Sequence, residues 1–133
     1  MRRSIRSRAV LAVVLLSPWL MGQEGHPLKG TWHGSWGVNP TDRTPVTLVM
    51  DWDGASITGI MNPGLRSSPL ERTAFDPAGW QFHFESIYKD RTGGTIRVTI
   101  DAKIQDVTSP RRALVGTWTQ GEKKGDFKAV RDN

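Results

Sequence analysis

Apolar and polar residues alternate along most of the chain after residue 29, and this period of two constrains the fold more than any other feature. Successive side chains of a β-strand point to opposite faces, so the alternation indicates strands with one buried face. Turn residues such as Asp53-Gly54 and Asp76-Pro77-Ala78-Gly79 separate the alternating segments. The pattern therefore predicts an all-β domain. It is clearest in segment 95–104, whose apolar phase holds Ile96, Val98, Ile100, Ala102 and Ile104.

Eight alternating segments follow one another with short connections, which favours an antiparallel up-and-down meander. A meander leaves two exposed sheet edges unless it closes, and closure at eight strands gives a small barrel. We expect this barrel. A two-sheet β-sandwich would give the same alternation and stays open as the alternative. The predicted strands are 30–36, 46–52, 56–62, 70–75, 80–88, 95–104, 113–120 and 126–131.

The first residues are typical of a secretory signal peptide. Four arginines without an acidic residue precede an apolar run over 9–16, and Gly22 is a small residue near the expected cleavage site. We expect a signal peptide over 1–23, cleaved after Gly22 or Gln23, and a single barrel domain over 24–133. The alternative is an anchor that is never removed. Arg2-Arg3 resembles the twin-arginine export signal, so both export routes stay open.

Removal of this segment would take away most of the net positive charge. The formal net charge of the chain is +5, and it falls to +1 because four arginines and no acidic residue are lost. We therefore expect an exported protein, periplasmic or extracellular, with no membrane span after cleavage and no nucleic-acid partner. The remaining basic pairs, Arg111-Arg112 and Lys123-Lys124, are expected to be solvated. The chain has no cysteine, which excludes disulfides, a thiolate nucleophile and cysteine-ligated metals.

The two ends of the domain carry a resemblance to a known superfamily. The first strand opens with Leu28-Lys29-Gly30-Thr31-Trp32, and the last strand, 127–131, ends in Arg131. This resembles the calycin superfamily of small barrels, which includes lipocalins and avidins. The resemblance implies that Trp32 lies near the barrel floor and that Arg131 packs across it, as a cation over an indole.

The direction of each strand in the predicted barrel determines which of its inward side chains lie near one end and which lie near the other. Aromatic side chains with a polar edge suit a small, mostly apolar or aromatic ligand, which we expect at one end. The alternative is that they fill a dry core, in an interaction protein (an inhibitor or an envelope component) that acts through its loops. The predicted ligand-binding residues are Trp36, Met61, Phe84, Tyr88 and Trp118. The predicted floor cluster is Trp32, Trp52, Trp80 and Arg131.

No arrangement of residues typical of catalysis or metal binding is found in the sequence. His33 and His83 fall in the polar phase of their strands and are expected to face solvent. His83 and Glu85 share a face, but two such groups do not make a catalytic triad. Asp51-Trp52-Asp53-Gly54 lacks the later acidic ligands of a calcium loop. We expect no catalytic residue, metal or cofactor. An enzyme is thus the third possibility, and the sequence does not fix the oligomeric state.

Overall fold

The computed structural model describes residues 25–64 and 66–132, so the predicted signal peptide lies outside the described residues. In the described part of the chain, no helix is long and apolar enough to cross a membrane. The chain forms eight β-strands, each antiparallel to its neighbours. They are β1 (Gly30–Gly37), β2 (Thr44–Trp52), β3 (Ile57–Met61), β4 (Ser68–Asp76), β5 (Gln81–Lys89), β6 (Thr95–Gln105), β7 (Ala113–Gln120) and β8 (Lys123–Arg131).

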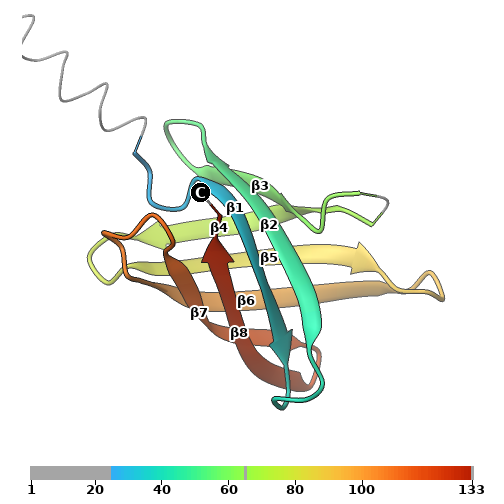
Figure 1. Ribbon diagram of the computed structural model, residues 1–133. Helices are drawn as coiled ribbons and strands as arrows, with labels where there is room; N and C mark the ends of the chain where they lie inside the picture. Colours follow the sequence, from blue (N-terminus) through green and yellow to red (C-terminus); the bar gives the residue numbers. More distant parts are fainter. Residues whose placement is uncertain (1–24, 65, 133) are drawn as a thin grey trace, which may run out of the picture.

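The strands close into a barrel in chain order, because β8 pairs with β1 (Figure 1). The closing register runs from Trp32 opposite Arg131 to Gly37 opposite Asp126. The predicted closed meander is therefore confirmed, and the two-sheet alternative is not formed. The strand bounds lie within three residues of the predicted ones, with the largest difference at β8, which begins at Lys123.

The inward phase of the strands makes one continuous hydrophobic core. Its members alternate with more exposed residues most regularly along β5 and β6, as the sequence pattern predicts. The core is filled by large side chains that are 2% exposed or less. They include Trp32, Leu48, Met61, Phe82, Phe84, Val98, Ile100, Leu114, Trp118 and Phe127.

The pairing around the ring is uneven. Strands β5 and β6 pair along nine residues, whereas β3 and β4 pair only at Ile60 opposite Pro69 and Met61 opposite Ser68. A bulge follows in β4 between Glu71 and Ala74, where Arg72 has a φ of 49°. This left-handed conformation is uncommon for a residue with a side chain, and it breaks the alternation of β4.

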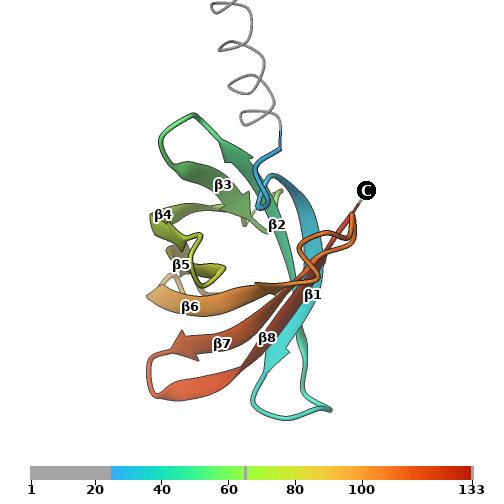
Figure 2. The same cartoon turned by 90° about the vertical axis from the view of Figure 1, so that its left-hand side faces the viewer.

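The barrel has two ends, which we call the mouth and the floor. The loops after β1, β3, β5 and β7 surround the mouth, and Figure 2 shows the β1–β2 and β7–β8 connections lying there together. The loops after β2, β4 and β6 surround the floor. The segment 25–29 also lies there, and the end of the chain lies beside it (Figure 1).

Several glycines permit close approach between strands, and Gly34 and Gly116 are two of them. A Cβ atom on Gly34 of β1 would overlap the Lys128 carbonyl oxygen of β8, and one on Gly116 of β7 would overlap that of Asp101 on β6. In contrast, a Cβ atom on Gly79 would meet only the Gln81 side chain, at an ordinary 3.5 Å.

We predict that Gly34→Ala and Gly116→Ala each destabilise the barrel by at least about 2 kcal/mol, within the range for overpacked cores. The backbone must shift to accept the new methyl group, since neither overlapping atom belongs to a flexible side chain. Urea denaturation followed by circular dichroism measures the change. Gly79→Ala is the matched control, and equal denaturation midpoints for all three variants would contradict the prediction.

Candidate ligand-binding site

A stacked pair of indoles lies at the mouth. The rings of Trp36 on β1 and Trp118 on β7 have centroids 5.0 Å apart and planes 6° from parallel. Strand β8 lies between β1 and β7, and it presents Gly125 opposite Trp118. Phe127 packs against Trp118 with a centroid distance of 6.0 Å. Such aromatic contacts stabilise by about 0.5–1.5 kcal/mol beyond their buried area, so the pair forms a firm apolar surface.

This indole pair borders a cavity of about 360 Å³. Its lining combines apolar side chains with polar residues from strand ends and from the mouth loops. The apolar part is contributed by Trp36, Pro45, Val46, Met61, Tyr88, Ile96 and Trp118, and the polar part by Thr44, Asn62, Arg66, Ser68, Lys89, Asp90 and Arg91.

Four of the five predicted ligand-binding residues line this cavity, namely Trp36, Met61, Tyr88 and Trp118. Phe84 does not, because it lies four residues before Tyr88 on β5, or about 13 Å along the strand away from the mouth. Its side chain is fully buried and packs against Phe82, with centroids 5.2 Å apart. Val46 and Ile96 also line the cavity but are not among the predicted ligand-binding residues, although their inward phase and their nearness to the mouth loops could have indicated them.

Tyr88 brings a polar group into the lining of the same cavity. Its hydroxyl donates a hydrogen bond to Gln120 Oε1 at 2.9 Å, and Trp118 Nε1 lies 3.5 Å from the same oxygen. Burial, together with the nearby charge of Asp90, raises the pKa of the Tyr88 phenol. The phenol therefore stays protonated at neutral pH and is held in one orientation beside the indole pair.

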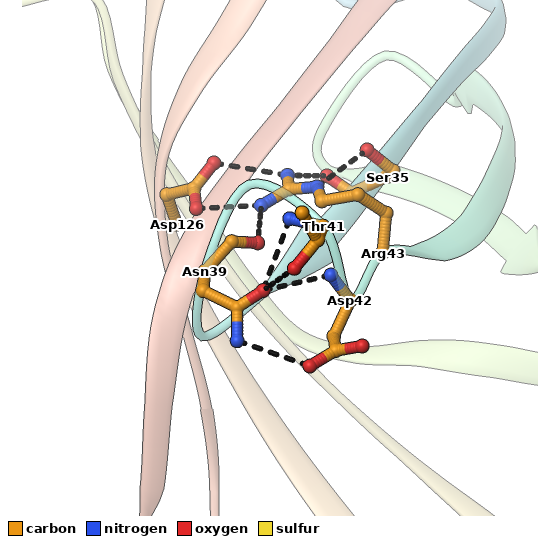
Figure 3. Close-up of polar contacts among 6 residues, drawn as sticks. All are labelled: Ser35, Asn39, Thr41, Asp42, Arg43 and Asp126. Carbon is orange, nitrogen blue, oxygen red and sulfur yellow. Dashed lines mark hydrogen bonds and ion pairs between the residues drawn. The ribbon is translucent and has the colours of Figure 1, made fainter.

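The β1–β2 loop at the mouth is fixed by a network around Arg43 (Figure 3). The Arg43 guanidinium donates to both carboxylate oxygens of Asp126 on β8, at 2.7 and 2.9 Å. It also donates to the side-chain and main-chain oxygens of Ser35. Asn39 Oδ1 accepts from the Thr41 and Asp42 amides, at 3.0 and 2.7 Å. The loop beside Trp36 is thus tied to β8 across β1.

The floor brings together only part of the predicted cluster. Trp32 is fully buried, and its Nε1 donates to the Leu28 carbonyl oxygen at 3.0 Å. Arg131 lies over Gly30, where its Nε donates to the Lys29 carbonyl oxygen at 2.7 Å. Trp52 and Trp80 lie apart from these two and line a separate cleft of about 480 Å³.

The N-terminal segment 25–29 closes the floor. The His26 ring stacks on Trp52, with centroids 4.6 Å apart, and its Nδ1 accepts a hydrogen bond from the Leu28 amide. Arg112 donates to the carbonyl oxygens of Pro27 and Val107, at 2.9 and 2.7 Å. Arg112 is half-buried and forms structural contacts, so the expectation of a solvated pair at 111–112 is wrong for this residue.

His83 forms a polar cluster on the outer face of the barrel. Its Nδ1 lies 2.7 Å from Asp101 Oδ1, and its Nε2 lies 3.2 Å from Glu85 Oε2. The hydrogen bond with Asp101 raises the pKa of His83, and the hydrogen bond with His83 lowers the pKa of Glu85. Arg97 Nη1 lies 3.0 Å from Glu85 Oε1. Among residues 25–64 and 66–132, no group of three or more His, Asp or Glu side chains could hold a metal ion.

Comparisons with protein-family models, with curated proteins and with solved structures find no significant match to this chain. The resemblance to calycins therefore rests on architecture, and the eight-stranded antiparallel closed barrel is compatible with it. A small barrel with an aromatic cluster at one end is in turn compatible with binding a small ligand.

We predict that Arg43→Lys loosens the mouth loop, because lysine keeps the charge but cannot donate to both oxygens of Asp126. The rate of amide hydrogen exchange in residues 38–42, measured by mass spectrometry, should rise about tenfold. Arg97→Lys, which alters an ion pair on the outer face, is the control. Unchanged exchange in the Arg43 variant would show that the network does not hold the loop.

We also predict that the floor is sensitive to acid through His26. Burial and the nearby Arg112 lower the pKa of His26, so the folded state favours the neutral ring. Its stabilising contribution is complete above the ordinary pKa of about 6.5 and is lost as the pH falls below that value. The thermal midpoint of the protein should therefore drop more between pH 7.5 and 5.5 than that of His26→Phe, which keeps a stacked ring.

A His83 variant is also measured, because His83 changes the pH dependence of the thermal midpoint in the opposite direction. Its raised pKa gives a stability that is complete below about 6.5 and is lost as the pH rises through the raised value. His83→Gln should thus show a larger drop on acidification than the unmodified protein. Equal pH dependence for the unmodified protein and His26→Phe would disprove the role of His26.

Proposed function

We propose that this protein is exported and that its barrel mouth binds a small, mostly apolar or aromatic molecule. The observation that carries the proposal is the stacked Trp36–Trp118 pair bordering a cavity of about 360 Å³. An apolar cavity of about 150 Å³ accepts a benzene ring. The mouth thus has room for a body of about two aromatic rings or a short acyl chain.

The position of the cavity supports a shallow mode of binding. The middle of the barrel is occupied by fully buried side chains such as Phe82, Phe84 and Phe127. A ligand would therefore lie on the indole pair and under the mouth loops, without passing through the barrel. At about 0.3–0.4 kcal/mol for each of some 16 ligand atoms, we expect dissociation constants of about 20–300 μM.

The filled middle also favours the second candidate, an interaction protein that acts through its loops. The two candidates differ in what occupies the mouth. A small-molecule site must lose its ligand when the cavity is filled, whereas a loop surface needs no cavity. Filling the cavity therefore separates them.

We predict that Ile96→Trp abolishes binding of N-phenyl-1-naphthylamine, a neutral aromatic probe whose fluorescence rises in apolar surroundings. Ile96 is half-buried and lines the cavity, so a larger ring there occupies the space of the probe. Fluorescence titration of the purified protein gives the dissociation constant, and circular dichroism verifies that the variant is folded.

Ile60→Trp is the matched control, because Ile60 is 38% exposed and belongs to the outward phase of β3. It should bind the probe like the unmodified protein. If Ile96→Trp binds the probe as tightly as the unmodified protein does, the probe binds outside the mouth cavity. If the folded, unmodified protein binds no probe of this class, the mouth site fails and the loop-acting candidate is favoured.

A further inference from the structure

Three cationic side chains gather on one side of the mouth. Arg66 lies in the β3–β4 loop, Lys89 ends β5, and Arg91 lies in the β5–β6 loop. All three line the aromatic cavity, and all three also line a second hollow of about 410 Å³. Tyr88 borders both hollows as well. The two spaces therefore meet at the cations, with the indole pair on one side of them.

These cations lack acidic partners in the described part of the chain, where no carboxylate lies within 4.0 Å of any of them. In contrast, Arg43 and Arg97 each form an ion pair. An arrangement of like charges around a hollow raises the local positive potential and attracts anions.

Asp90 is the one acidic residue in the lining of either hollow, and it is engaged in a turn. Its Oδ1 accepts hydrogen bonds from the amides of Thr92 and Gly94, at 2.9 and 2.8 Å, and from the Thr92 hydroxyl at 2.7 Å. The Thr92 hydroxyl is the main cause of a lowered pKa for Asp90, which stays ionised. One carboxylate against three cations leaves a positive excess.

We propose that the ligand of the mouth is an amphipathic anion, an inference that rests on the proposed function. Its apolar body lies against Trp36 and Trp118, and its carboxylate, sulfonate or phosphate group lies among Arg66, Lys89 and Arg91. Guanidinium groups bind such oxyanions through paired hydrogen bonds, and the ammonium group adds a compact charge. The apolar cavity and the cationic hollow then hold the two parts of one molecule.

The test uses two probes with the same aromatic body. 8-Anilinonaphthalene-1-sulfonate carries a sulfonate, and N-phenyl-1-naphthylamine is its neutral counterpart. We expect the anion to bind roughly tenfold more tightly to the unmodified protein at low salt, the combined effect of three exposed cations. Added sodium chloride should weaken binding of the anion and leave the neutral probe unchanged.

The triple variant Arg66→Gln, Lys89→Gln, Arg91→Gln should bind both probes equally, at the affinity of the neutral one. The double variant Lys123→Gln, Lys124→Gln is the control, because these lysines begin β8 at the same end of the barrel but line neither hollow. It should keep the preference for the anion. Ile96→Trp should abolish binding of both probes.

Each other outcome overturns a distinct claim. If neither probe binds, the proposed function fails. If both bind with equal affinity, or if the triple variant keeps the preference, the mouth binds apolar molecules but the anionic class is wrong. If the anion still binds to Ile96→Trp, the cations hold an anion without the indole pair, and the amphipathic ligand is ruled out.

Discussion

The pairing of β8 with β1 is the contact on which the rest of the structure depends. It joins segments about a hundred residues apart, and it removes the last free sheet edges. The Arg43–Asp126 ion pair lies at one end of this closure, and the Arg131–Lys29 hydrogen bond lies at the other. The Trp36–Trp118 stack also depends on it, because the two rings belong to the strands that pair with β8 on its two sides.

The ring is weakest where β3 faces β4. Two residue pairs join these strands, and beyond them the Thr73 hydroxyl donates to the Ile57 carbonyl oxygen at 2.7 Å in place of a main-chain ladder. The floor cleft lined by Trp52, Phe75 and Trp80 opens beside this gap. In a chain without cysteine, side-chain packing has to hold this part of the barrel together.

The alternation predicted the strands, because burial of one face follows directly from a period of two. The closure was expected from the number of strands, their short connections and the sheet edges that an open meander would expose. The alternation predicted β4 least well, since the bulge at Arg72 shifts the phase within a single strand. Trp80 shares the phase of Phe82, yet it precedes β5 with a φ of 54° and is 37% exposed. The role of Arg112 could not be predicted either, because its carbonyl partners depend on how the N-terminal segment folds over the floor.

The same core that stabilises the barrel limits where a ligand can lie. Large side chains fill the core, and the aromatic cavity and the floor cleft lie at its two ends. A molecule bound in such a shallow site keeps one end near solvent. A charged group at that end need not be desolvated, which removes the main cost of binding an anion. The shallow aromatic mouth and its cationic rim therefore favour the same class of ligand.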